Sequence, residues 1–184
     1  MIEHLILLLP SRIGSVLSVN NLREDLQVAY NTVRSWLEIL ERLYILFTLK
    51  PYTSKLSRSV HKERKIYLWD WSQIKDEGAR FENFVASHLW KAVQTWQDLG
   101  MGDFDLGFLR DRTQREVDFC ITKDRKPWLL IEAKLSDTQP SEALSYFSNR
   151  LGVPALQLVR SKGMDKRVGP IRVVSVGCWL LQLP

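Results

Sequence analysis

Two short motifs near the middle of the chain hold the residue types that phosphate chemistry uses. Asp118 lies within Glu116–Phe119, and Glu132 and Lys134 lie within Ile131–Lys134. Side chains alternate between the two faces of a strand, so Glu132 and Lys134 share one face. An Asp, a Glu and a Lys gathered at the ends of two strands are what a magnesium-dependent phosphodiesterase needs.

Hydrolysis of a phosphodiester requires a metal ion on the phosphate oxygens, an activated water and a charge that offsets the developing anion. Magnesium prefers oxygen ligands and keeps several waters. We therefore expect Mg²⁺, or Mn²⁺, on the carboxylates of Asp118 and Glu132 and the carbonyl of Ala133. Lys134 would orient or deprotonate the attacking water, or stabilise the developing charge. Glu82, at the border of a buried helix face, would hold a second metal ion or a metal-bound water.

The elements that position these residues are expected from the apolar patterns around them. The segment 128–135 is apolar on both faces, with Trp128 on the face of Glu132 and Lys134, and such strands lie inside a sheet. Residues 79–96 carry apolar side chains at helical spacing, which predicts a long helix. Further strands are expected at 104–109, 115–121, 153–159 and 171–176, an edge strand at 179–183 and a helix at 142–150. This order predicts an α/β fold with a mixed sheet flanked by helices.

The first fifty residues have the pattern of a winged helix-turn-helix. A short helix over 22–28, opened by Asn20 or Asn21, precedes a helix over 32–43, opened by Asn31, and a β-rich segment over 44–49 would form the wing. A second helix of this kind can lie in a DNA major groove. Arg34 favours that function, but the acidic residues on the same helix would face phosphates. A protein-docking module is the alternative, and it is slightly favoured.

A basic segment follows the winged helix. Residues 50–65 hold six Lys or Arg and one acidic residue, within a chain of net charge +5. Such a basic stretch either binds nucleic acid or forms a solvated linker, and a linker is the commoner case. The residues assigned to DNA binding are Arg34, Lys55, Arg58, Lys62 and Arg64. We expect a winged helix-turn-helix over 1–52, a basic linker with a short strand over 53–77, and a second domain over 78–184.

Composition places the chain among ordinary globular proteins and excludes several classes. Cys120 and Cys178 are too few for a disulfide framework and are expected to be reduced core residues of a cytoplasmic protein. The apolar run Leu5–Leu9 is too short to span a membrane, and no signal-peptide pattern is present, so no membrane partner is expected. No P-loop sequence occurs, so this chain alone is not expected to hydrolyse ATP.

The site motifs resemble the PD-(D/E)XK nuclease superfamily. In that superfamily a helical Glu precedes an Asp and a Glu/Asp-x-Lys, on a helix, a β-hairpin, a strand, a helix and a strand. The resemblance implies metal ligands at Asp118 and Glu132, a catalytic lysine at Lys134 and the helical acid at Glu82. Gln139 is a looser match to polar residues that often follow the motif.

A closer resemblance covers nearly the whole chain. Segments that look like the DUF4143 region are Asn31–Leu40, Pro51–Lys55, Lys65–Asp70, Gly78–Val85, Glu116–Phe119 and Ile131–Lys134. In many prokaryotic AAA-type ATPases this region follows a P-loop domain as a winged helix plus a nuclease-like domain. The resemblance implies that the ATPase half has been removed or that the gene encodes only the tail, with an ATPase as partner.

Several alternatives stay open from the residues alone. The chain is expected to be a magnesium-dependent DNA endonuclease, or else an inactive nuclease-like module that binds DNA or protein and regulates an ATPase. Glu116 competes with Asp118 as a ligand, and Arg112 or Arg115 could neutralise Asp118 in an ordinary ion pair. A homodimer is a further expectation, because nuclease-like folds that cut both strands usually act in pairs. A dimeric scaffold, suggested by Trp69, Trp71 and Trp179, is the weakest interpretation.

Overall fold

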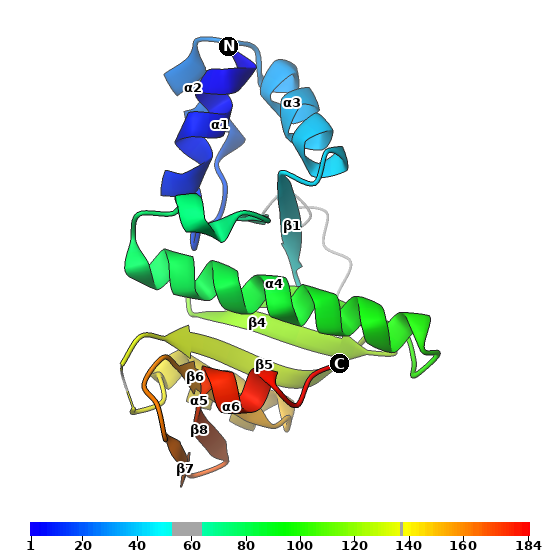
Figure 1. The fold of residues 1–184 in the computed structure, drawn as a ribbon, viewed down its shortest axis with the longest axis vertical. Helices are drawn as coiled ribbons and strands as arrows, with labels where there is room; N and C mark the ends of the chain where they lie inside the picture. The colour runs from blue at the N-terminus through cyan, green and yellow to red at the C-terminus, as the bar shows by residue number, and fades with distance from the viewer. Residues whose placement is uncertain (53–63, 137) are drawn as a thin grey trace.

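The protein is described by a computed structural model that covers residues 1–52, 64–136 and 138–184. Its centre is an eight-stranded mixed sheet with the strand order β2-β1-β3-β4-β5-β6-β8-β7 (Figure 1). The strands are β1 (Leu46–Pro51), β2 (Lys65–Leu68), β3 (Phe104–Arg110), β4 (Glu116–Lys123), β5 (Lys126–Lys134), β6 (Ala155–Val159), β7 (Asp165–Val168) and β8 (Ile171–Ser175). β1 runs parallel to β3, and β5, β6 and β8 run parallel to one another, whereas the other pairs are antiparallel. The expected α/β fold with a mixed sheet is therefore confirmed.

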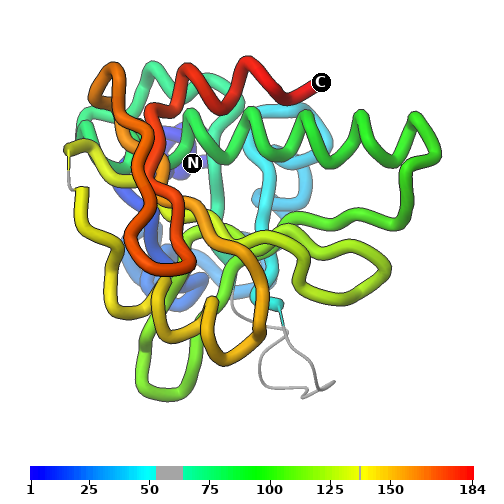
Figure 2. The backbone as a smooth tube through the Cα atoms, turned by 90° about the horizontal axis from the view of Figure 1, so that it is seen from below, coloured from blue at the N-terminus to red at the C-terminus, as the bar shows by residue number. Residues whose placement is uncertain are grey.

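Helices cover both faces of this sheet. The helices are α1 (Ile2–Leu8), α2 (Val19–Leu26), α3 (Tyr30–Arg42), α4 (Glu77–Asp98), α5 (Glu142–Leu151) and α6 (Val176–Leu180), with short 3-10 turns at Leu9–Arg12 and Trp71–Gln73. α4 and α6 lie on the same side of the sheet (Figure 2) and share the larger apolar core. α5 packs on β4, β5 and β6 around a second, smaller core, so it covers the opposite face.

Local sequence explains the two helices nearest the candidate site. Asp76 caps α4 by accepting from the Ala79 amide at 2.8 Å, and the apolar stripe of this helix is buried. Ser141 caps α5 by accepting from the Leu144 amide at 3.1 Å, as the sequence indicated. α5 ends at Gly152, whose φ of 65° is the left-handed conformation that glycine adopts without strain.

The amino-terminal residues are joined to the sheet. Three helices, α1 to α3, precede the antiparallel hairpin of β1 and β2, and β1 also pairs with β3 through Lys50↔Gly107 and Pro51↔Phe108. The strand expected as a wing is thus also a strand of the central sheet. The expected helix caps are wrong: Ser18 caps α2, and α3 begins at Tyr30 after Ala29 without a side-chain cap.

Three other expectations differ from the structure. Residues 179–183 do not form an edge strand, because α6 covers the first of them, and β7 was not expected. Trp128 packs against Trp96 of α4 (ring centroids 5.7 Å apart), because an irregularity in the β4–β5 register next to it moves its ring away from the face of Glu132. Cys178 is exposed and only Cys120 is buried, and both are free thiols.

Among the described residues, each helix is too short or too polar to cross a bilayer.

Candidate active site

A β-bulge in β4 places Asp118. Gly107 of β3 pairs with Cys120 of β4, and Leu109 pairs with Val117. The two-residue advance from Gly107 to Leu109 is therefore matched by three residues of β4. The extra residue lets Asp118 and the following Phe119 both lie on the α4 side, whereas their neighbours on either side pack in the smaller core with α5. A bulge of this kind turns a side chain out of the regular alternation.

The strands β4 and β5 part next to the bulge. Their register ends at Phe119↔Ile131, and beyond it the Ala133 amide donates to Oδ2 of Asp118 at 3.0 Å. The Asp118 carboxylate therefore accepts the hydrogen bond that a backbone carbonyl would accept in a regular antiparallel ladder. The role assigned to Ala133 was its carbonyl, which stays a prediction; its amide is what fixes Asp118.

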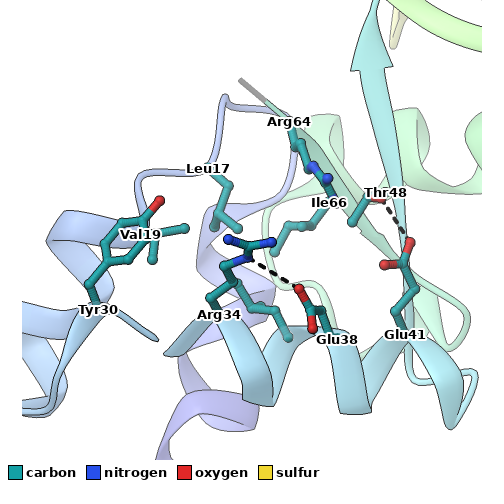
Figure 3. A pocket seen from close by; sticks show the side chains of 10 residues that line it. Leu17, Val19, Tyr30, Arg34, Glu38, Glu41, Thr48, Arg64 and Ile66 are labelled. Atoms are coloured by element: carbon teal, nitrogen blue, oxygen red, sulfur yellow. Dashed lines mark hydrogen bonds and ion pairs between the residues drawn. The ribbon is translucent and has the colours of Figure 1, made fainter. Parts of the chain in front are cut away.

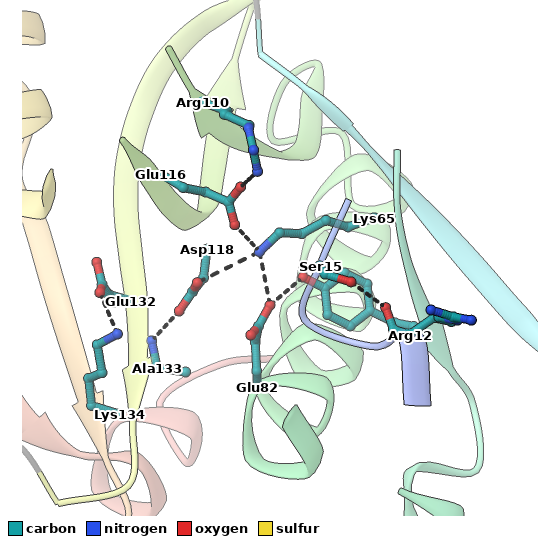
Figure 4. A network of polar contacts seen from close by, with 11 residues as sticks. Arg12, Ser15, Lys65, Glu82, Arg110, Glu116, Asp118, Glu132, Ala133 and Lys134 are labelled. Atoms are coloured by element: carbon teal, nitrogen blue, oxygen red, sulfur yellow. Dashed lines mark hydrogen bonds and ion pairs between the residues drawn. The ribbon is translucent and has the colours of Figure 1, made fainter. Parts of the chain in front are cut away.

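Glu132 and Lys134 form a pair at the end of β5. Lys134 Nζ lies 2.8 Å from Oε1 of Glu132 (Figure 4). The Ser141 hydroxyl donates to Oε2 of Glu132 at 2.8 Å. Glu132 is buried, whereas 40 % of the Lys134 side chain is exposed. The cap residue of α5 thus also orients the carboxylate, and the ammonium reaches solvent.

Glu82 of α4 approaches the same place from above the sheet. Its Oε1 accepts from the Tyr67 hydroxyl at 2.8 Å and from Lys65 Nζ at 3.2 Å. The Lys65 ammonium also lies 2.6 Å from Oε1 of Glu116 and 3.8 Å from Oδ1 of Asp118 (Figure 4). A lysine of β2 therefore stands among three carboxylates from α4 and β4.

Among the described residues, neither of the two arginines considered as partners of Asp118 forms an ion pair with it. Arg115 bonds Asp111 at 2.8 Å and lies 3.7 Å from the centre of the Tyr146 ring, while Arg112 is exposed. Glu116 is held on one oxygen by Lys65 and on the other by Arg110 at 2.8 Å, so both of its oxygens are already paired.

A family model described as Domain of unknown function (DUF4143) matches residues 77–179, which is more than half of the chain. The chain belongs to this family. A second model, Domain of unknown function (DUF8612), matches residues 1–74. No curated protein and no solved structure matches the chain. All four residues predicted for catalysis lie in the DUF4143 match, and Lys65 lies in the other.

Crowded negative charge shifts the protonation of the DUF4143 carboxylates. Burial, and then the charge of Asp118, raise the pKa of Glu82 to about 7. The same two causes raise the pKa of Glu132, against the opposing hydrogen bonds from Lys134 and Ser141. Burial alone would lower the pKa of Lys134, but its hydrogen bond and ion pair with Glu132 raise it, so this side chain is a cation at neutral pH.

The donor set fits a hard divalent cation. Asp118 and Glu132 offer oxygen ligands on adjacent strands. Burial first, and then the charge of Asp118, raise the pKa of each of Glu82 and Glu132, and a bound cation would offset the second of these causes. Among the residues that the structure describes, no three His, Cys, Asp or Glu side chains are grouped to hold an ion together. A divalent ion at this site would therefore be coordinated by two carboxylates and would keep most of its water ligands.

Sequence reasoning missed three residues of the candidate site. Ser141 had been noticed only as a helix start, although a hydroxyl at that position can serve a cap and a nearby carboxylate at once. Lys65 was counted with the basic segment, and Tyr67 within an apolar strand. Their alternation along β2 was the available signal, because Lys65 and Tyr67 share a face.

Of the residues predicted to bind DNA, the two that the structure describes do not lie at the carboxylates. Arg34 and Arg64 line a cavity of about 230 Å³ between α3 and the β1–β2 hairpin, with Ile66 in its wall (Figure 3). This is the face of β2 opposite to Lys65, and Arg34 is paired there with Glu38 at 3.2 Å. Lys55, Arg58 and Lys62 lie outside the described residues.

Proposed function

We propose that the chain hydrolyses phosphodiester bonds of nucleic acid, DNA in the first place, with Mg²⁺ or Mn²⁺ as cofactor. The observation that carries the proposal is the convergence of Asp118, Glu132 and Lys134 where β4 and β5 part, with Glu82 beside them. The PD-(D/E)XK architecture belongs to the same proposal. It is supported by the order of α4, the strands β3 to β5, α5 and β6.

The chemistry divides between the cofactor and the chain. When bound, the ion would polarise the phosphate and lower the pKa of a bound water. Asp118 and Glu132 would hold it, with Asp118 fixed by the Ala133 amide. The hydrogen bond and ion pair with Glu132 raise the pKa of Lys134, which favours a role by charge, orienting the water or offsetting charge on the phosphate, over a role as the base.

Basic residues beside the bulge favour a polynucleotide substrate. The turn between β3 and β4 carries the exposed Arg112 and Arg115, only a few residues before Asp118. Arg115 stacks on Tyr146 of α5, and Arg150 hydrogen-bonds the Tyr146 hydroxyl. Guanidinium groups bind phosphate oxygens with two parallel hydrogen bonds, so this turn is suited to hold the backbone next to the scissile bond.

Cleavage of supercoiled plasmid by the purified chain tests the proposal. We expect nicking with Mg²⁺ or Mn²⁺, none with chelator, and a loss of at least about 100-fold in Asp118→Asn and Lys134→Met. The matched controls are Asp98→Asn and Lys162→Met, both at exposed positions. Nicking that survives both site substitutions would contradict the assignment.

One observation favours a second candidate, an inactive nuclease-like module that binds DNA or a protein such as an ATPase. Lys65 already pairs with three carboxylates, and both oxygens of Glu132 are bonded. In that case the chain shifts DNA in a gel without cutting it, and the shift weakens when Arg112 and Arg115 are both replaced by Gln. The winged helix would then be the docking surface for the partner.

A further inference from the structure

Lys65 is the least expected charged group of the protein. It is the first residue of β2, and its side chain is completely buried. Its ammonium is 2.6 Å from Glu116, 3.2 Å from Glu82 and 3.8 Å from Asp118. An ammonium is very costly to bury unless it is paired, and this one has three partners.

The three carboxylates need a cation as much as Lys65 needs anions. Glu82 and Asp118 are parts of the proposed active site, and Glu116 is two residues from Asp118 on the same strand. Without Lys65, the described partners of these side chains on the α4 side of the sheet would be reduced to two. Arg110 would still pair with the outer oxygen of Glu116, and the Tyr67 hydroxyl would still donate to Glu82. The lysine also borders Oδ1 of Asp118 while the Ala133 amide holds Oδ2, so the carboxylate is fixed from both sides.

We propose that Lys65 is a tethered cation that takes the place of a second metal ion, so that the site accepts one divalent ion, between Asp118 and Glu132. The inference rests on the proposed function for that one ion. Lys65 is a positioning residue: it acts through Asp118 and Glu82 rather than on the substrate. The separations of 2.6–3.8 Å suit an ammonium, whereas Mg²⁺ binds oxygen at about 2.1 Å.

This assignment makes one site from both matched families. Lys65 lies in the DUF8612 match and its partners in the DUF4143 match. The β1–β3 pairing and the contacts of β2 with α4 hold the two together. A cation supplied from the first segment therefore sets how many metal ions the second can bind.

Titration calorimetry with Mn²⁺ tests the inference on the full chain. We expect one ion for the wild type and for the control Lys162→Met. We expect two for Lys65→Met, because removal of the ammonium frees oxygens of Glu82, Glu116 and Asp118 to bind a second ion. Lys65→Arg, which keeps the charge, should bind one. A single ion of unchanged affinity in Lys65→Met would overturn the inference.

Thermal melting covers the case in which Lys65→Met is poorly folded. We expect the melting temperature of this variant to be lower than that of the wild type in chelator. Addition of Mn²⁺ should raise the melting temperature of the variant by more than it raises that of the wild type. A variant unfolded in both conditions would also contradict the idea that a divalent ion can replace the ammonium. If the wild type binds no ion but Lys65→Met binds one, the nuclease proposal fails and the role of Lys65 stands.

Discussion

Asn83 of α4 clamps both backbone groups of Leu68 in β2. The Leu68 amide donates to Oδ1 of Asn83 at 2.7 Å, and Nδ2 donates to the Leu68 carbonyl at 2.8 Å. Asn83 is completely buried. The clamp satisfies two groups of the edge strand and fixes β2, and therefore Lys65, against α4.

Removal of this clamp should destabilise the whole fold. Asn83→Ala leaves a buried donor and acceptor unpaired, at about 1–3 kcal/mol each, so we expect a loss of about 2–6 kcal/mol in the free energy of unfolding. Urea denaturation measures it. The control Asn149→Ala, on the exposed end of α5, should change it by less than about 0.5 kcal/mol. Equal effects at both positions would contradict the importance of the clamp.

Gly107 controls the approach of β1 to β3. A Cβ at this position would lie 2.6 Å from the Lys50 carbonyl oxygen, which is backbone and cannot move aside cheaply. Gly107→Ala should therefore lower the free energy of unfolding by about 1–3 kcal/mol, by the usual cost of forcing extra volume into a packed site. Gly177→Ala in α6, with nothing within 4 Å, should leave stability unchanged or raise it. A neutral Gly107→Ala would show that the parallel pair is looser than described.

The pH dependence of stability should reveal Glu82. Its folded pKa of about 7 is above its ordinary value of 4.5, so its favourable contribution is present below pH 4.5 and is lost as the pH rises through 7. Glu82→Gln keeps the shape without the charge. In chelator, the free energy of unfolding of Glu82→Gln should increase relative to that of the wild type between pH 5 and pH 8, by at most about 3 kcal/mol.

The experiment compares melting of Glu82→Gln and wild type across that pH range. Glu142→Gln, on the exposed surface of α5, is the matched control for loss of a carboxylate. A difference that shrinks with rising pH would mean that the ion pair with Lys65 outweighs the cost of burial.

The two thiols should differ sharply in reactivity. Burial, with a contribution from Asp105, raises the pKa of Cys120 to about 12, while Cys178 is exposed. Because the thiolate is the nucleophile, iodoacetamide at pH 8 should label Cys178 in the native protein and Cys120 only in denaturant. Mass spectrometry of the labelled peptides reads the result, and rapid native labelling of Cys120 would show that β4 opens.

Much of the part of the fold that begins at α4 follows from local pattern. The stripe of α4 and the Ser141 cap of α5 are encoded within a few residues, and so is the pairing of Glu132 with Lys134. The bulge at Asp118 was not predictable, because it is defined by the register of β3 against β4. The orientation of Trp128 toward α4 was not predictable for the same reason, because it depends on the register of β4 against β5.

Lys65 shows why long-range electrostatics escapes such a prediction. In sequence it ends a basic stretch, where a lysine is normally solvated. Its burial depends on carboxylates 17 residues away, at Glu82, and farther still, on β4. α6 was missed for another reason: its residues Val176–Leu180 are apolar and β-branched at the start, and periodicity does not separate a strand from so short a helix.

The position of Lys65 also bears on how such proteins can be recombined. A gene rearrangement that replaced residues 1–74 with those of a relative would bring in new helices and, with them, a new residue opposite Glu82, Glu116 and Asp118. The chimera would keep its charge balance only if the incoming segment carried a lysine or an arginine at the matching position. Exchange of one segment without the other would therefore disturb the charge balance around this single ammonium group.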